Sequence, residues 1–248
     1  MKLFNFILTL ILSLVLCGNS FSQSTIFLGD STSLTPFYKN TVLHGFGVQN
    51  ISSYDPGASF EKACEDALTD LNSNLFLSVY LETFKKNDIY FYNFPELSVR
   101  DTVLSYGKSI IRQDSLRIND QAVCVAVKSG GGRSVTTSMP DVSELMVRPK
   151  KVGDTWFAIG KSEVTSFSQS QSWMKAKNYA VKELTKVLKT SVQSLKKQYE
   201  DNSTSQVSEL TYFKSNIILQ NIHNVQRFTS KDWFVVVIAV KQEDVIEY

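Results

Sequence analysis

The sequence has few of the residues on which metal and nucleophile chemistry usually depends. It holds two histidines and three cysteines in 248 residues. Neither His44 nor His223 lies in a ligand-spaced group of histidine, cysteine and carboxylate residues, so we expect no metal site. No Gly-x-Ser-x-Gly elbow occurs, and the glycine run 130–132 lacks the Lys-Ser/Thr pair of a phosphate-binding loop. The sequence therefore predicts a protein that is not an enzyme and needs no cofactor.

A strong excess of either charge is also absent. The chain carries 26 basic and 24 acidic side chains, which gives a formal net charge of +2. A general nucleic-acid binder usually has a clear basic excess, so we expect no nucleic-acid partner. Hydrophobic residues make up 43% of the chain and charged residues 20%. These values argue against a disordered, collagen-like or coiled-coil protein and favour globular domains.

Long hydrophobic runs are lacking except at the N-terminus. Residues 3–16 are nearly all apolar and follow a short positive start. A bilayer span needs about 20 such residues, so this shorter run is typical of a secretory signal peptide. Ser20 and Ser22 supply small side chains at the −3 and −1 positions of a cleavage site. We therefore predict a signal peptide over residues 1–22.

Cys17 is a candidate lipidation site within that segment. A lipoprotein signal ends in a small residue followed by the cysteine that receives the lipid. Leu14 fits such a pattern, but Leu16 is too large for the position directly before the cysteine. We favour an unmodified cysteine inside the hydrophobic run, with lipidation as the alternative. Membrane contact is expected to be peripheral or absent unless Cys17 is lipidated.

The rest of the chain contains an internal repeat with a shift of 113 residues. Residues 60–79 and 173–192 share seven of 20 positions, where unrelated segments would share about one or two. The same shift, without a gap, pairs residues 123–128 with 236–241. The matched small and apolar residues that we take as structural are Gly47, Ala63, Ala67, Leu71, Gly160, Ala176, Ala180 and Leu184.

The spacing of these residues predicts the local structure of each copy. The alanines and leucines recur every four residues, which places them on one face of a helix. Each glycine lies in a short apolar run ahead of its helix, which indicates a close backbone approach or a strand end with unusual dihedrals. Further strands are expected at 99–111 and 122–128 in copy one, and at 207–218 and 233–241 in copy two.

Each copy is therefore a predicted β-α-β-β unit, and the fold class is α+β with a helix on a small antiparallel sheet. Alternate residues of 122–128 are apolar on both faces, which indicates a strand covered on both sides. The predicted organisation, in chain order, is a signal peptide (1–22), an N-terminal lead (23–40), a first unit (41–128), a Gly/Ser/Pro linker (129–152) and a second unit (153–248).

Copy two carries a motif that has a family resemblance. An aromatic residue and Ala-x-Gly at 156–160 precede a Ser/Gln-rich spacer at 162–172, and the Ala-x3-Ala-x3-Leu stripe follows. The motif resembles the LPP-twenty lipoprotein family of bacterial envelopes and the related N-terminal domain of a periplasmic flagellar basal-body protein. It covers about residues 153–241. Copy one departs from it, with His-Gly-Phe-Gly at 44–47 in place of Ala-x-Gly.

The resemblance implies a dodecin-like sheet wrapped around its helix. It also implies a bacterial protein of the periplasm or outer membrane that is non-enzymatic and supports larger assemblies. Its partners would be other envelope proteins or a second copy of itself. The lipidated cysteine of the family would correspond to Cys17.

Two candidate interaction surfaces stand out from this pattern. Aromatic residues crowd segment 76–94, and they include Tyr90, Phe91, Tyr92 and Phe94. The segment is either a binding surface or, as we favour, part of the core or of the contact between units.

The predicted helices at 60–84 and 173–197 carry opposite charge. The first holds Glu61, Glu65, Asp66 and Asp70, and the second holds Lys175, Lys177, Lys182, Lys186 and Lys189. Solvated faces are the simpler interpretation, and docking between the units or onto an anionic surface is the alternative.

Cys64 and Cys124 are the two thiols that remain after cleavage. Cys64 aligns with Lys177, which we expect to face solvent, whereas Cys124 aligns with Val237, which we expect in the core. A disulfide needs its two Cβ atoms about 4 Å apart. An exported compartment permits a disulfide, but we favour two unlinked thiols, with the disulfide as the alternative.

The function that follows is a structural or adaptor component of an envelope assembly. The alternative is a module that binds a small planar or apolar ligand near the 76–94 aromatics.

Overall fold

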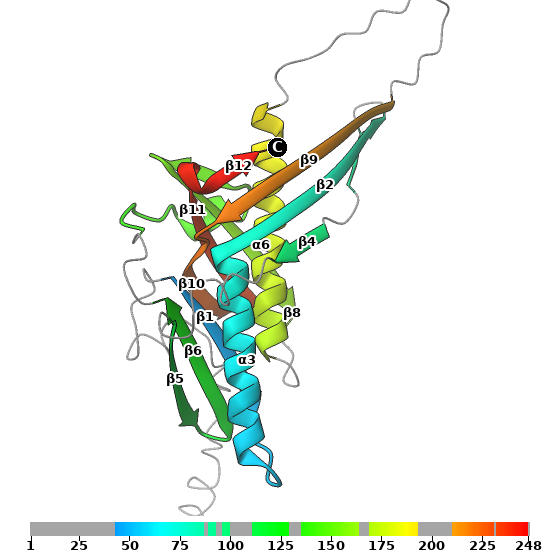
Figure 1. The fold of residues 1–248 in the computed structure, drawn as a ribbon. Helices are drawn as coiled ribbons and strands as arrows, with labels where there is room; N and C mark the ends of the chain where they lie inside the picture. Colours follow the sequence, from blue (N-terminus) through cyan, green and yellow to red (C-terminus); the bar gives the residue numbers. More distant parts are fainter. Residues whose placement is uncertain are drawn as a thin grey trace, which may run out of the picture.

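The computed structural model describes residues 43–86, 89–92, 96–99, 111–128, 135–163, 169–192, 210–230 and 232–247. The described residues form antiparallel sheets and two long helices that lie side by side (Figure 1). The fold is thus mixed α and β, with antiparallel sheets, as predicted. The expected signal peptide, Cys17 and the N-terminal lead lie outside the described residues. Within the described ranges, no helix is long and apolar enough to cross a membrane.

The first half of the chain builds a sheet against helix α3 (Pro56–Leu75). Its strands are β1 (His44–Asn50), β5 (Ile111–Ile118) and β6 (Gln121–Lys128), in the order β1-β6-β5. Asp55 caps the helix by accepting a hydrogen bond from the Ala58 N–H at 2.9 Å, and Pro56 occupies the first turn. Both residues are favoured at a helix start because they satisfy or remove N–H groups that have no intrahelical partner.

The second half builds the same arrangement against helix α6 (Gln169–Val192). Its strands β8 (Thr155–Glu163), β10 (His223–Ser230) and β11 (Trp233–Lys241) lie in the order β10-β11-β8. A short strand β7 (Lys150–Val152) extends this sheet beside β8, and the four-residue helix α5 (Val142–Leu145) precedes it. The structure therefore places two short elements in the region predicted as a linker (129–152).

A third sheet joins the two halves. Strand β2 (Phe76–Lys86) follows α3, and it pairs along its whole length with β9 (Leu210–Gln220) of the second half. Two short strands, β3 (Ile89–Tyr92) and β4 (Glu96–Val99), pair with β2. The last strand, β12 (Val245–Glu247), follows the 3-10 turn Gln242–Asp244 and pairs with β9. The long β2–β9 ribbon projects beyond the helices (Figure 1).

One apolar core is shared between the halves. Phe46 and Val125 of the first half belong to the same buried cluster as Trp173 and Phe234 of the second. The Trp173 and Phe234 rings lie 4.3 Å apart between centroids. Strand β6 is covered on both faces, as predicted: its alanines and Cys124 pack toward α3, and its valines pack into the shared core.

The glycines of the repeat set the distance between sheet and helix in each half. A Cβ on Gly47 would overlap the carbonyl oxygen of Ala63, and a Cβ on Gly160 would overlap that of Ala176. Neither strand ends at its glycine, so the expectation of a close backbone approach is confirmed. The equivalent contacts in the two halves also support the 113-residue shift for this part of the repeat.

Helix α3 is shorter than its predicted range of 60–84. It ends at Leu75, and the polypeptide continues directly as β2. The run Phe-Leu-Ser-Val-Tyr-Leu at 76–81 alternates buried and half-buried residues, which is the period of a strand. Strands β5 and β10 were missed as well, because polar residues outnumber apolar ones in both. The strand predicted at 99–111 lies mainly outside the described residues.

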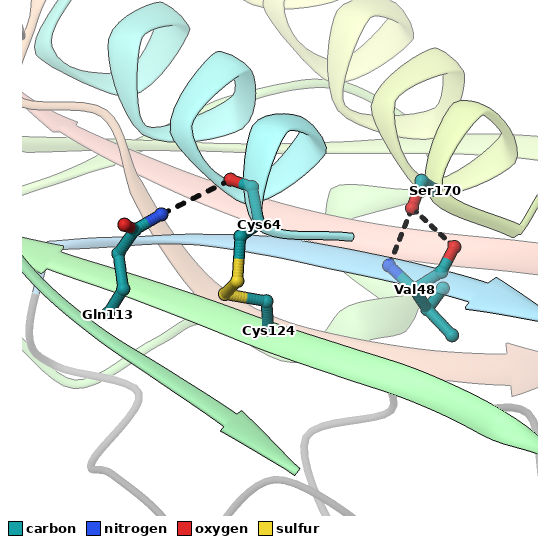
Figure 2. The surroundings of a disulfide bond; sticks show 5 residues. All are labelled: Val48, Cys64, Gln113, Cys124 and Ser170. Carbon is teal, nitrogen blue, oxygen red and sulfur yellow. Dashed lines mark hydrogen bonds between the residues drawn. A yellow bond between two sulfur atoms is a disulfide. The ribbon is translucent and has the colours of Figure 1, made fainter. Parts of the chain in front are cut away.

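The expectation of unlinked thiols was wrong, because Cys64 on α3 and Cys124 on β6 form a disulfide (Figure 2). Their Cα atoms are 5.0 Å apart, within the usual range. The bond closes a loop with a sequence separation of 60, which a chain-entropy estimate values at about 4 kcal/mol. Gln113 donates to the Cys64 carbonyl at 3.4 Å beside it.

Cys124 is in the core, as expected, but the inference of opposite environments for the two thiols fails for two identifiable reasons. Lys177, the counterpart of Cys64, is buried at 2% exposure instead of facing solvent. The ungapped match of the last strands is also off by one residue. Cys124 lies opposite Gly47, but it is Val236, not Val237, that lies opposite Gly160. A slip of one residue moves a side chain to the other face of a sheet.

Replacing Gly47 with alanine tests the close contact directly. We expect Gly47→Ala to lower the free energy of unfolding by about 3 kcal/mol, since a rigid helix backbone occupies the space that a methyl group needs. Urea unfolding monitored by circular dichroism measures this loss. Gly57→Ala is the matched control, because a Cβ there meets only the Asp55 side chain at 3.4 Å and alanine favours a helix. Equal stability of the two variants would contradict the packing described here.

Candidate functional site

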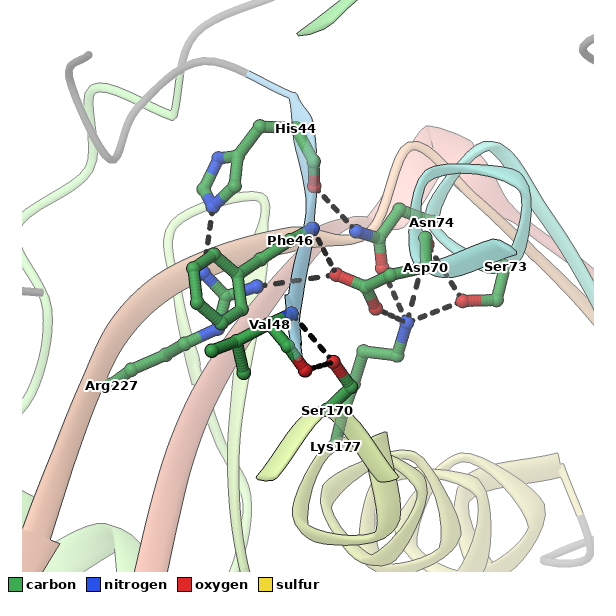
Figure 3. A network of polar contacts seen from close by, with 9 residues as sticks. All are labelled: His44, Phe46, Val48, Asp70, Ser73, Asn74, Ser170, Lys177 and Arg227. Atoms are coloured by element: carbon green, nitrogen blue, oxygen red, sulfur yellow. Dashed lines mark hydrogen bonds and ion pairs between the residues drawn. The ribbon is translucent and has the colours of Figure 1, made fainter. Parts of the chain in front are cut away.

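Asp70 lies at the centre of a buried polar network that joins the two halves (Figure 3). Its side chain projects from α3 and is only 5% exposed. One carboxylate oxygen accepts a hydrogen bond from Lys177 of α6. The other accepts from the N–H of Phe46 on β1 at 3.1 Å and from Arg227 of β10 at 3.3 Å. A single carboxylate therefore contacts three elements besides its own helix.

The Lys177 ammonium group is hydrogen-bonded by polar atoms of α3. It donates to Asp70, to the Ser73 hydroxyl and to the Asn74 side-chain oxygen, the last at 3.0 Å. An ammonium group has three N–H donors, and these partners use all of them. Burial of a charge is costly unless it is paired and hydrogen-bonded, and Lys177 meets both conditions.

Arg227 completes the network on the side of β10. Its guanidinium lies 2.9 Å from the His44 Nε2 atom and 5.6 Å above the Phe46 ring. His44 is 1% exposed, and its carbonyl oxygen accepts from Asn74 at 2.8 Å. The structure therefore gives His44 a polar contact that its counterpart Phe157 cannot make.

The network also closes the outer edge of β1. An edge strand presents unpaired N–H and C=O groups along one side. On β1, Asp70 accepts from the Phe46 N–H, and the Ser170 hydroxyl bridges the N–H and C=O of Val48 at 2.7 and 2.9 Å. Ser170 lies at the start of α6, so the second half of the chain seals the sheet of the first.

Burial and charge act in opposite directions on these groups. Burial alone would raise the pKa of the Asp70 carboxyl, but the positive charges of Lys177 and Arg227 outweigh it and hold that pKa below its ordinary value of 3.8. Burial lowers the pKa of the Lys177 ammonium from its ordinary 10.5, and the Asp70 charge offsets this shift only in part. The cavity that touches the network is about 10 Å³ in volume, roughly the space that one water molecule needs.

A much larger groove of about 640 Å³ lies on the second half. Its floor is the end of β8, and one wall is the α6 face that carries Lys175 and Tyr179. Residues 145–149, which lead into β7, and Trp233 also line it. Apolar surface is exposed here: Met146 is 49% exposed, Tyr179 47% and Trp233 37%.

The groove has a positive balance of charge. Arg148, Lys161 and Lys175 line it, and Lys161 lies 4.9 Å from the centre of the Trp233 ring. Of its two carboxylates, Glu183 is already paired with Lys186 at 2.7 Å, which leaves Glu163. The arrangement suits an anionic and partly apolar ligand better than a cation.

The residues predicted from the sequence fall into three groups. The eight repeat residues all lie at the helix–sheet contacts, and each of the six non-glycine ones is buried. Lys175 lines the groove, whereas Lys182 and Lys186 are half-buried on α6. The third group cannot be placed by side chain: the backbone of Tyr90, Phe91 and Tyr92 forms β3, Lys189 lies on α6, and Phe94 and Cys17 are outside the described residues.

Sequence reasoning missed the network because its members were assigned to solvated faces. Asp70 and Lys177 each directly adjoin a residue of the apolar stripe, Leu71 and Ala176. A charge at the border of such a stripe is the signal that could have identified them. The alternative of docking between oppositely charged helices holds for this pair, although the pair is buried and not a surface contact.

Comparisons with known proteins add no name to this site. No family model, curated protein or solved structure matches the chain. Among the described residues, no group of three or more histidine, cysteine and acidic side chains could hold a metal ion.

Neutralising Asp70 tests whether the network holds the halves together. We expect Asp70→Asn to lower the free energy of unfolding by about 3–5 kcal/mol, because it leaves two buried cations without a counter-ion. Urea unfolding at neutral pH measures this loss. Glu65→Gln on the same helix is the control, since its side chain is 68% exposed and we expect a change within about 0.5 kcal/mol.

The same variant has a distinct pH dependence. A carboxyl with a lowered folded pKa contributes stability above its unfolded pKa, and that stability is lost as pH falls through the folded pKa. The gap between wild type and Asp70→Asn should therefore stay constant near neutrality and narrow as pH falls below 3.8. A gap that widened on acidification, or no gap at any pH, would contradict the ion network.

Proposed function

We propose that this chain is an exported, non-enzymatic bacterial cell-envelope protein that acts as an adaptor in an envelope assembly. In this proposal it is an LPP-twenty-like protein of two tandem dodecin-like units. The observation that carries the proposal is the groove beside β8, where Met146, Tyr179 and Trp233 are exposed together. Exposed apolar surface with a polar rim is typical of a site that another molecule covers.

The disulfide supports export. Disulfides persist in oxidising compartments such as the bacterial periplasm and are rare in the cytosol. The Cys64–Cys124 bond is therefore in keeping with the predicted signal peptide, and it does not depend on the sequence of residues 1–22.

The tandem arrangement is supported by the matching order of strands. The sheet order β1-β6-β5 of the first half corresponds to β8-β11-β10 of the second. In each half the first strand carries a glycine against the helix that follows it. Duplication of one ancestral β-α-β-β unit accounts for both matches.

A role without catalysis is supported by the enclosure of the charged network. Asp70, Lys177, Arg227 and His44 form a connected group of charged and polar side chains, and each residue is at most 4% exposed. A substrate needs a cavity of roughly 300 Å³ or more, and the cavity beside these groups is about 10 Å³. The network thus serves the fold.

Binding of a small planar ligand is the second candidate function. The groove volume of about 640 Å³ is in the range of small-molecule sites, and Tyr179 and Trp233 offer ring faces. This candidate places the ligand on the second unit and not beside the 76–94 aromatics.

Cross-linking from the groove in the native cell tests the adaptor function. We expect a photoreactive phenylalanine analogue at position 179 to capture a specific envelope protein, because the side chain of Tyr179 lines the groove. Affinity purification and mass spectrometry identify the product. Position 54 is the control, since Tyr54 is 99% exposed and outside the groove.

Recovery of monomer alone, or the same products from both positions, would contradict an adaptor. A coloured preparation whose absorbance is lost in a Trp233→Ala variant would favour the small-ligand candidate instead.

A further inference from the structure

The strand β8 has one edge that is only partly covered. Along one side it pairs with β11 over its full length, from Thr155 to Glu163. Along the other side β7 pairs only with residues 155–157. Beyond that point the chain leading into β7 leaves the edge at Pro149 and forms a wall of the groove. In the described part of the chain, no strand pairs with this side of residues 158–163.

The main-chain groups at the open edge can be assigned from the β7–β8 hairpin. Val152 and Thr155 pair across a two-residue turn, and two residues further along β8 Phe157 pairs with Lys150. Residues 155 and 157 therefore point their N–H and C=O groups toward β7. These directions alternate along an antiparallel strand. Ile159 and Lys161 therefore present their N–H and C=O groups to the groove.

The first half provides an independent check on this assignment. There the residues on either side of Gly47 donate outward, Phe46 to Asp70 at 3.1 Å and Val48 to Ser170 at 2.7 Å. Ile159 and Lys161 flank Gly160 in the same way. The edge of β1 is thus closed by side chains of the two helices, whereas the equivalent edge of β8 lines an open groove.

We propose that the groove binds an extended acidic segment of a partner protein, which adds as a strand to the open edge of β8. The open run of residues 158–163 is about 20 Å long, which suits a strand of ordinary length. Strand addition obtains affinity from main-chain hydrogen bonds and specificity from side-chain pockets on alternate sides. This inference rests on the proposed adaptor function and specifies how that site takes its partner.

The charge and the aromatic residues at the groove select the chemistry of the segment. Lys175 and Tyr179 lie on the side of α6, and Lys161 contacts Trp233 on the other face of the sheet. Each face therefore offers one cation and one aromatic ring to the residues that an added strand would present. An extended segment with acidic and apolar side chains complements both faces.

A pair of substitutions at one position separates the main chain from the side chain. Lys161→Ala keeps the N–H and removes the ammonium group, whereas Lys161→Pro also removes the N–H. Proline is tolerated on an edge strand where its nitrogen faces away from the sheet partner. Thermal unfolding of both variants establishes that they are folded.

The probe is a peptide selected from a phage-displayed library of random linear sequences on the immobilised, disulfide-bonded protein. We expect the selected peptides to be rich in acidic and apolar residues. Their affinity should fall about two- to threefold for Lys161→Ala and roughly tenfold or more for Lys161→Pro, which leaves a peptide carbonyl without its donor. Equal affinities for wild type and Lys161→Pro, or no peptide that binds, would overturn the proposal.

Amide exchange in the wild-type protein provides a test that needs no variant. Saturation with the selected peptide should slow deuterium exchange at the Ile159 and Lys161 amides by an order of magnitude or more. Unchanged exchange at both would overturn the proposal. A dimer in sedimentation velocity that Lys161→Pro dissociates would identify a second copy as the occupant and overturn the assignment to a partner.

Failure of this inference is distinguishable from failure of the adaptor function. If position 179 captures the same envelope protein in wild type and in Lys161→Pro, strand addition is wrong and the adaptor function stands. If the peptide behaves as expected but position 179 captures no envelope protein, strand addition stands and the adaptor function is wrong.

Discussion

The ion pair between Asp70 and Lys177 is the interaction on which the arrangement of the two halves depends. Each residue comes from the central helix of its own half, and each is almost completely buried. The cost of removing two charges from water is large, so the network is stable only while both helices keep their relative position. Arg227 and the Phe46 N–H add the sheet of each half to the same carboxylate. Apolar packing forms the shared core, and the Asp70 carboxylate fixes the position of the two halves relative to each other.

The residues that connect the halves differ between the two segments that the 113-residue shift relates. Shifting Asp70 by 113 residues leads to Glu183, which is half-buried and pairs with Lys186 on its own helix. The same shift takes Cys64 to Lys177. At this position the first half has a disulfide within itself, whereas in the second half Lys177 contacts Asp70 on α3. The strand edges differ as well: the start of α6 covers the edge of β1, and no strand in the described part of the chain pairs with the equivalent edge of β8 beyond residue 157.

Much of the architecture could be predicted from the sequence because it rests on local periodicity. The alanine and leucine stripe, the glycine ahead of each helix and the two-sided apolar strand each report a short-range pattern with a direct physical cause. The features that were not predicted depend on non-local contacts. The end of α3 at Leu75, the one-residue slip of the last strand and the burial of Lys177 depend on partners more than 70 residues away in the chain. No single-segment pattern contains that information.

The groove could not have been predicted for a related reason. Tyr179 and Trp233 belong to segments predicted as a helix and a strand, and their exposure depends on where the chain before β7 leaves the sheet. Residue type alone made the 76–94 aromatics a candidate surface, with the core or the contact between the units as the favoured interpretation. The described part of that segment contributes β2, whose Leu77, Val79 and Leu81 are buried, to the ribbon that connects the halves.

The central claim is that the same strand edge is closed in the first half and open in the second. Amide hydrogen exchange of the free protein, resolved by residue, tests it most directly. We expect strong protection at Phe46 and Val48, which donate to buried side chains, and fast exchange at Ile159 and Lys161. Comparable protection at the two pairs of amides would contradict it.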